Sequence, residues 1–177
     1  MVILDQISHQ KRRKWFRRED TPSISSYLSE ESITFLQAKT RDDALEQLVY
    51  TLKKAGKIQD APAFHELILK REQIVSTDIG LNAALPHAKS ADFSEFFIAL
   101  GVQKEEEGIR WKSPHHHASD HHSAVRLVFM IGGPENQPKE YLDLLSNLTR
   151  ILKDEDLRKS LLSIDTISAL YRQISLY

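Results

Sequence analysis

Ser76-Thr77-Asp78-Ile79-Gly80-Leu81-Asn82-Ala83-Ala84-Leu85-Pro86-His87-Ala88-Lys89 is the stretch that decides how this chain is organised. A small polar turn leads into a short apolar run, which ends at Pro86, and His87 follows directly. Proline fixes its own φ angle and disfavours helical geometry in the residue before it. We therefore expect a short buried strand that stops at Pro86 and places His87 where the strand meets a loop.

The residue types around His87 indicate phosphoryl chemistry. Histidine can act as a covalent nucleophile, and its ordinary pKa near 6.5 leaves much of it neutral at pH 7. Ser76 and Thr77 offer hydroxyl and N–H groups to an anion, and Arg71 offers a planar fork suited to phosphate oxygens. These residues predict that His87 takes up a phosphoryl group whose charge they screen. From residue types alone, a structural histidine that caps a strand end is an equal alternative.

A family resemblance rests on the same residues. The string Arg71-Glu72, Ser76-Thr77, Ile79-Gly80 and Ala84-Leu85-Pro86-His87-Ala88 resembles the signature of the type-2 enzyme IIA domains of the bacterial phosphoenolpyruvate-dependent sugar phosphotransferase system. This family has fructose, mannitol and nitrogen-regulatory branches, and the resemblance runs from about residue 28 to residue 174. It implies that His87 is phosphorylated by a phosphohistidine carrier protein, that Arg71 lies beside it, and that no cofactor takes part.

The resemblance also bears on partners. A sugar-transport role requires an enzyme IIB and a membrane IIC partner, and neither is fused to this sequence. A stand-alone domain with this amino-terminal extension most resembles the nitrogen-regulatory branch. In that case the phosphorylation state regulates binding to a downstream protein, because it adds about two negative charges to one surface patch.

The sequence departs from the family pattern at four positions, one of which is Leu81, where the family often has a small polar residue. Asp78 and Asn82 stand where the family usually has glycine, and a carboxylate at 78 disfavours a nearby phosphate by like-charge repulsion. Tyr141 stands where the family often has a second histidine that helps the transfer. Tyrosine can donate a hydrogen bond but is not a cation at pH 7, so Tyr141 either donates to the phosphate or has no part in transfer. A non-catalytic interaction module on the same fold is therefore the alternative function.

Composition predicts one globular domain in the cytoplasm. The chain has 177 residues, 41% hydrophobic and 28% charged, with a formal net charge of −1, which gives no reason to expect nucleic-acid binding. It has no cysteine, so disulfides and thiolate metal sites are excluded. No apolar run approaches the length of a membrane span, and the amino terminus lacks the apolar core of a signal peptide.

Residues 1–26 read as a basic extension, and residues 27–177 as the phosphocarrier domain. A basic cluster over 11–18 surrounds two aromatic residues, and the polar stretch 21–26 is typical of a linker. The basic cluster could bind an acidic partner, a membrane surface or RNA. We favour a mobile arm or a short helix packed on the domain, because short basic runs are common and unspecific.

The periodicity of the domain predicts an α/β fold, with a small mixed sheet and helices on both faces. Thr40 with Asp43 resembles a capping box, Gly56 marks a helix end, and Asp60 begins a second helix that delivers Arg71 to the turn. Apolar and β-branched runs predict the strands, and the strongest of them reads as a central strand covered on both faces. The expected strands are 33–38, 83–85, 96–102, 109–111 and 125–131, and the expected helices are 44–55, 61–72, 138–152, 154–162 and 167–174.

Five of the eight histidines lie close together in a polar stretch over 113–123: His115, His116, His117, His121 and His122. Histidine is a ligand for Zn²⁺ or Ni²⁺, so a metal-binding protein is a third hypothesis. Adjacent histidines in a loop rich in proline and serine impose no fixed geometry, however. We therefore favour an exposed loop with weak, adventitious metal affinity, and we predict no metal site.

Overall fold

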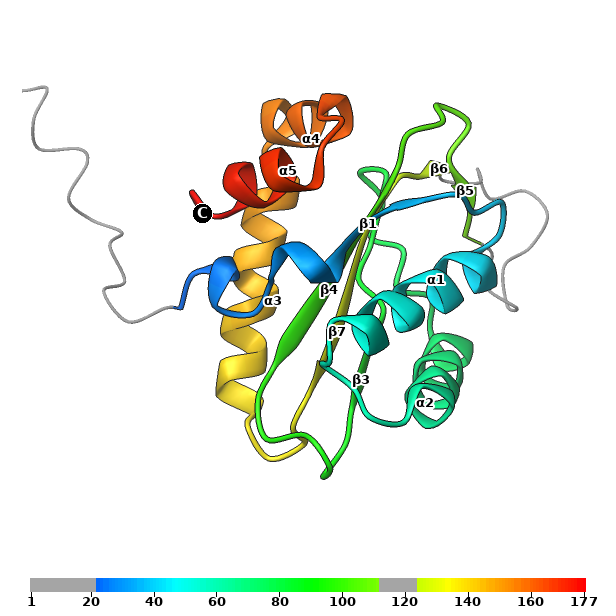
Figure 1. Ribbon diagram of the computed structural model, residues 1–177, viewed down its shortest axis with the longest axis vertical. Coiled ribbons are helices and arrows are strands. Elements are labelled where there is room, and N and C mark those ends of the chain that lie inside the picture. The colour runs from blue at the N-terminus through cyan, green and yellow to red at the C-terminus, as the bar shows by residue number, and fades with distance from the viewer. Residues whose placement is uncertain (1–21, 112–123) are drawn as a thin grey trace, which may run out of the picture.

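The computed structural model describes residues 22–111 and 124–177, and it is built around one mixed β-sheet (Figure 1). The sheet order is β1 (Ile33–Leu36), β4 (Phe97–Gln103), β7 (Leu127–Gly133) and then β2 (Ala83–Ala84). β3 (His87–Lys89) also pairs with β7, in the same parallel sense as β2. β4 and β7 are antiparallel to each other and buried along their whole length. A separate pair of short strands is formed by β5 (Ile109–Arg110) and β6 (Ala124–Val125).

Helices cover both faces of this sheet, as predicted (Figure 1). On one face, α1 (Arg41–Lys54) and α2 (Ala61–Ile74) pack over the apolar side chains of β4 and β7. On the other face lie α3 (Pro138–Lys153), α4 (Glu155–Ser163) and α5 (Ile167–Ile174). Two short 3-10 turns, Ile24–Ser26 and Glu30–Ser32, lead into β1.

The predicted helix boundaries are confirmed by their hydrogen bonds. The Thr40 hydroxyl accepts from the Asp43 N–H while the Asp43 carboxylate accepts from the Thr40 N–H, which is a capping box at the start of α1. The Asp60 carboxylate accepts from the Ala63 N–H and begins α2. Gly56, with φ of 71°, follows the end of α1. These local signals place α2 so that Arg71 lies in its last turn.

The strand predicted over 125–131 is two strands in the structure. Arg126 interrupts it because its backbone N–H donates to the Asn82 carbonyl and its guanidinium donates to the carbonyls of Gln103 and Lys104. The second strand continues through Gly132 and Gly133, which were expected to end it. A Cβ atom at Gly132 would lie about 2 Å from the ring of Phe97, and one at Gly133 would lie about 2 Å from the ring of Phe96.

The short strand stops before Pro86, as predicted, and His87 lies at a strand boundary, but it begins a second strand and does not lead into a loop. β2 ends at Ala84, and the ladder resumes at His87, which is the first residue of β3 and pairs with Ile131. Leu85 and Pro86 form the break, because proline has no N–H to contribute to the ladder. His87 is therefore held by backbone pairing on a rigid strand.

The packed part of the chain begins before residue 27, where the domain boundary was predicted. Ile24 is fully buried in the core cluster on the α3 face, inside the 21–26 stretch that was expected to be a linker. The Asn147 side chain also donates to the carbonyl of Pro22. The basic cluster at 11–18 lies outside the described residues.

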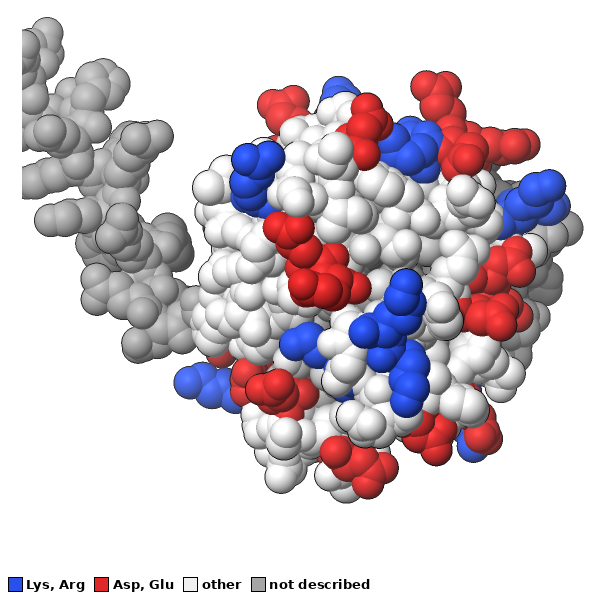
Figure 2. Space-filling view, in the orientation of Figure 1, with Lys and Arg blue, Asp and Glu red and all other residues white. Residues whose placement is uncertain are grey.

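The molecular surface carries charges of both signs. The face in Figure 2 shows lysine and arginine side chains interspersed with aspartate and glutamate, in keeping with the net charge of −1. Among the helices of residues 22–111 and 124–177, none has the length and apolar character needed to cross a bilayer.

The turn before β2 holds three consecutive residues in the left-handed region. Gly80, Leu81 and Asn82 have φ angles of 72°, 58° and 58°. A leucine in this region strains the backbone, because its Cβ approaches a carbonyl oxygen. Asn82 tolerates the conformation better, and its side-chain amide donates to the Ala124 carbonyl. The geometry accounts for the expectation of glycine at position 82.

Replacing Leu81 with glycine is expected to raise the free energy of unfolding by about 0.5–1 kcal/mol, because it relieves this strain. Leu81 is 44% exposed, so little burial is lost. Urea denaturation measures the change. Ile79→Gly is the matched control, since Ile79 is 41% exposed in the same turn but has no positive φ. This variant should lower stability; a loss in both variants would contradict the strain argument.

Candidate functional site

The His87 imidazole is fixed on both of its nitrogens. Nδ1 lies 3.0 Å from the carbonyl oxygen of Leu85, two residues earlier. The Nε–H of Arg71 donates to Nε2 at 3.0 Å. A carbonyl can only accept and a guanidinium can only donate, so Nδ1 carries the proton and Nε2 carries the lone pair. The arrangement presents Nε2 as the nucleophilic atom, with a fixed cation beside it.

Arg71 reaches His87 from the last turn of α2. Its Nη1 donates to the carbonyl of Val75, just beyond the end of the helix, so the guanidinium plane is held by two contacts. The Arg71 Nε–H occupies the Nε2 lone pair, so this hydrogen bond must open before Nε2 attacks, and the guanidinium can then donate to the oxygen atoms of a phosphoryl group. The sequence-based expectation that Arg71 lies beside His87 agrees with this geometry.

A buried carboxylate organises the segment that follows α2. Glu72 is 1% exposed and accepts three hydrogen bonds. The donors are the Thr77 N–H at 2.9 Å, the Thr77 hydroxyl at 2.6 Å and the Trp111 indole N–H at 2.8 Å. Glu72 thus ties the turn and the end of β5 to the helix that carries Arg71.

Thr77 and Ser76 were predicted to bind or support the phosphate. Both donors of Thr77 are used by Glu72, and its side chain is buried. The Ser76 hydroxyl accepts from the Asp78 N–H at 3.3 Å. The Asp78 carboxylate in turn accepts from the Gly80 N–H, so it takes part in the turn itself. These contacts shape the turn, and within the described residues neither Ser76 nor Thr77 hydrogen-bonds to His87.

Tyr141, in the first turn of α3, lies against the imidazole. Its ring centroid is 5.6 Å from that of His87, with an angle of 51° between the planes. The ring stacks on Phe96 and carries the Lys89 ammonium 4.4 Å from its centroid. Burial raises the pKa of Tyr141, so it stays a neutral phenol at pH 7. The structure therefore brings Arg71 and Tyr141, both predicted, into contact with His87.

Burial lowers the pKa of His87 below its ordinary value of 6.5. The hydrogen bond to the Leu85 carbonyl opposes this effect, the positive charges of Arg71 and Lys89 add to it, and Glu72 opposes it again. The imidazole is consequently neutral at pH 7, the state in which Nε2 can attack.

We expect the His87 ring to titrate below pH 6.5 in an NMR titration, with its signal assigned by loss in His87→Gln. Protonation occupies Nε2, so reactivity should fall only as the pH drops through this lowered pKa. The pKa of His87 is lowered in the folded protein and ordinary in the unfolded chain, so between these two values the unfolded chain binds the proton more readily. Stability should therefore also decrease as the pH falls through that window. A titration midpoint above 6.5 would contradict the prediction.

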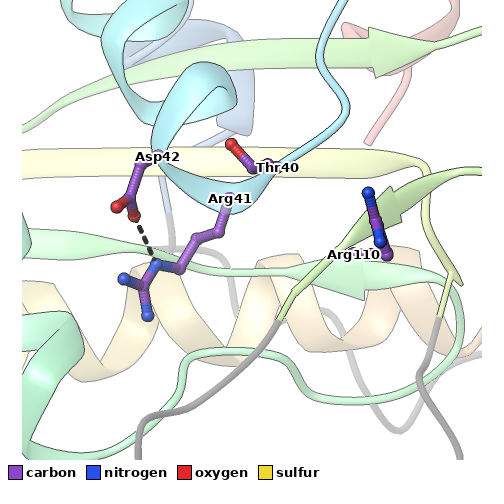
Figure 3. Close-up of a pocket in the computed structure, with 4 residues that line it drawn as sticks. All are labelled: Thr40, Arg41, Asp42 and Arg110. Atoms are coloured by element: carbon purple, nitrogen blue, oxygen red, sulfur yellow. Dashed lines mark hydrogen bonds and ion pairs between the residues drawn. The ribbon is translucent and has the colours of Figure 1, made fainter.

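Two hollows lie apart from His87. One, of about 290 Å³, is at the start of α1 and is lined by Thr40, Arg41, Asp42 and Arg110 (Figure 3). None of these four lining residues is a histidine, the Thr40 hydroxyl caps the helix, and Arg41 donates to Asp42 at 2.8 Å. The other, of about 490 Å³, lies between the α1–α2 connection and the segment after β3. The nucleophile with an adjacent cation is at His87.

The described part of the chain has no candidate metal site. No group of three histidine, aspartate or glutamate side chains within 22–111 and 124–177 is arranged to hold an ion. The histidine loop, with His115, His116, His117, His121 and His122, lies outside the described residues, so its affinity for metal stays a prediction.

Sequence reasoning missed the parts played by Glu72 and Lys89. Glu72 was noted only as the neighbour of Arg71, although its spacing of four residues from the apolar Ile68 places it on the core-facing side of the helix. Lys89 was quoted without a role. Its signal is its spacing, because residues two apart on a strand share a face, and His87 is two residues earlier.

The comparisons with known proteins agree on one family. The family model described as "Phosphoenolpyruvate-dependent sugar phosphotransferase system, EIIA 2" matches residues 26–176. A fructose-specific EIIABC component of Bacillus subtilis is 34% identical over 152 residues, which are 83% of this chain and 22% of that protein. The chain thus spans about a fifth of that relative. A nitrogen regulatory protein of Bradyrhizobium diazoefficiens is 27% identical over 80% of this chain and 86% of its own length.

Solved structures show the same fold. The nitrogen regulatory protein IIA-Ntr of Neisseria meningitidis superimposes with a TM-score of 0.71 at 21% identity, over 85% of this chain and 98% of that one. Mannitol IIA of Escherichia coli gives a TM-score of 0.67 at 22% identity, over 83% of this chain and 98% of its own. At these identities the likeness establishes the fold alone.

Proposed function

Because the chain belongs to the type-2 EIIA family of the phosphoenolpyruvate-dependent sugar phosphotransferase system, we propose that it is a phosphocarrier that uses His87. The observation that carries the proposal is the state of the imidazole. Its Nδ1–H is tied to the Leu85 carbonyl, and its Nε2 lone pair faces the Arg71 guanidinium. We assign Nε2 as the atom that accepts the phosphoryl group from a phosphohistidine carrier protein.

The transfer balances without an added cofactor. The Nε2 lone pair forms the new N–P bond as the N–P bond of the donor breaks, and that electron pair returns to the donor imidazole. The His87 proton stays on Nδ1 against the Leu85 carbonyl. Arg71 hydrogen-bonds the phosphoryl oxygens as their charge passes over. Thr77 supports this site through Glu72, and Ser76 holds the turn.

The surface around the site suits a protein donor and a protein acceptor. Ile74, the last residue of α2, and Val75, which follows it, are 70% and 59% exposed. Leu142, next to Tyr141, is 63% exposed. Exposed apolar side chains next in sequence to residues that contact a reactive histidine are typical of a docking surface. We propose that phosphorylation there regulates binding of a downstream protein, by adding about two negative charges.

The function is tested by following the phosphoryl group. The protein is incubated with phosphoenolpyruvate, enzyme I and the histidine carrier protein, and acid-labile phosphate is mapped after trypsin at neutral pH. The tryptic peptide 72–89 has His87 as its single histidine, whereas peptide 113–126 carries the five loop histidines. We expect the label in peptide 72–89. A folded protein that takes no label from any carrier would instead be a binding module, and label in peptide 113–126 would also overturn the assignment.

A further inference from the structure

Lys89 shares a strand face with the nucleophile. His87 and Lys89 are both partly exposed on β3, while Ala88 between them is buried on the opposite side. Alternate residues of a strand point to the same face, with Cα atoms about 6.5 Å apart. The backbone pairing of β3 with β7 fixes this relation, so the lysine stem starts beside the imidazole.

The Tyr141 ring links the two side chains. It lies 5.6 Å from the His87 ring, and the Lys89 ammonium lies 4.4 Å from its centroid, within the range of a cation–π contact. Phe96 stacks on the tyrosine ring at 6.1 Å with an interplanar angle of 23°, which holds the ring in place. Tyr141 therefore acts as a platform that keeps a positive charge near the His87 imidazole.

Beyond the Tyr141 ring, the Lys89 ammonium has no charged or hydrogen-bonding partner among the described residues. Within residues 22–111 and 124–177 it makes no ion pair or hydrogen bond, and the ring face of Tyr141 is its one polar contact. Arg71, by contrast, is bound to His87 and to Val75. An ammonium has three donors, and a phosphoryl group on His87 would offer it charged acceptors that a ring face cannot match.

We propose that Lys89, held on the face of Tyr141, binds the oxygens of the phosphoryl group on His87, and that Tyr141 positions it. The inference rests on the proposed function of His87. It assigns the second positive charge of the site to Lys89, so the chain needs no second histidine at position 141. Arg71 and Lys89 then approach the phosphoryl group from α2 and from β3.

Single-turnover transfer from the phosphorylated carrier protein tests the proposal. Lys89→Gln is expected to lower the maximal rate roughly tenfold, with the half-saturating carrier concentration changed less than twofold, and Lys89→Arg should recover most of the rate. Lys54→Gln is the matched control, because Lys54 lies 5.7 Å over the Tyr50 ring on α1 and should change nothing. If Lys89→Gln changes only the half-saturating carrier concentration and leaves the maximal rate unchanged, Lys89 is a docking residue and the proposal is overturned.

The platform is tested with the tyrosine. Tyr141→Phe keeps the ring and should retain the rate, whereas Tyr141→Ala should lower it about as much as Lys89→Gln. The double variant Lys89→Gln/Tyr141→Ala should be no slower than Lys89→Gln alone, because both changes remove the same contact between the ammonium and the ring. If the wild type takes no label, the function of His87 fails; if the wild type is labelled and Lys89→Gln matches it, only the role of Lys89 fails.

Discussion

Replacing His87 with glutamine is expected to reduce acid-labile phosphorylation to background while the protein stays folded. A glutamine amide has its nitrogen lone pair delocalised into the carbonyl, so it cannot form the N–P bond that Nε2 forms. The loss should be complete, since Arg71, Lys89 and Tyr141 can stabilise a phosphoryl group but none replaces the imidazole at Nε2. Labelling by the phosphorylated carrier protein, quantified at neutral pH, measures the effect.

His65→Gln is the matched control for this experiment. His65 lies on α2, the helix that carries Arg71, and should accept no phosphate, so its variant should label as the wild type does. Circular dichroism and the urea midpoint of His87→Gln should lie close to those of the wild type, because the half-buried side chain is replaced by one of similar size. Label that persists in His87→Gln would move the acceptor to another residue.

Local signals in the sequence were enough to predict the helices. The Thr40–Asp43 capping box, the Asp60 cap and Gly56 act within a few residues, and the structure has each of them. The central position of β7 was also predicted, because a run of apolar residues without alternation needs cover on both faces. The predicted arrangement, a small mixed sheet with helices on both faces, is confirmed.

The strand ends were harder to predict because distant residues decide them. Arg126 breaks a run of strand formers through bonds to Gln103 and Lys104, which are more than twenty residues away. Gly132 and Gly133 stay in the strand because the rings of Phe96 and Phe97 lie over them. The burial of Ile24 depends on α3 and α5, so a polar stretch that resembles a linker is partly packed.

In the candidate site, too, residues marked by local sequence signals were predicted, and residues whose role depends on distant contacts were not. His87 and Arg71 were predicted because proline, the turn residues and the family resemblance mark them along the chain. Lys89 becomes meaningful only when α3 places Tyr141 beside it, and the two residues are separated by 52 positions. A carboxylate such as Glu72 was not expected in the core, because its donors come from Thr77 and from Trp111, 39 residues away.

Replacing Glu72 with alanine is therefore expected to cost about 3–5 kcal/mol of the free energy of unfolding, the largest stability effect we predict for a single residue. The change leaves the Thr77 N–H and the Trp111 indole N–H buried without an acceptor, and it adds a cavity. Glu72→Gln keeps one acceptor oxygen and should cost less, about 1–2 kcal/mol. Urea denaturation measures both changes, and the Trp111 indole N–H resonance reports the lost hydrogen bond.

Glu66→Ala on the same helix separates this effect from helix propensity. Glu66 is exposed and pairs with Lys70 at 2.7 Å, so its removal should leave the urea midpoint close to that of the wild type. Thr77→Val in the Glu72→Ala background should add little, because the two residues share the same hydrogen bonds. Equal losses for Glu66→Ala and Glu72→Ala would contradict the role of the carboxylate. A loss of stability in Glu72→Ala but not in Glu66→Ala would show that the end of α2, which carries Arg71, depends on the buried Glu72 side chain.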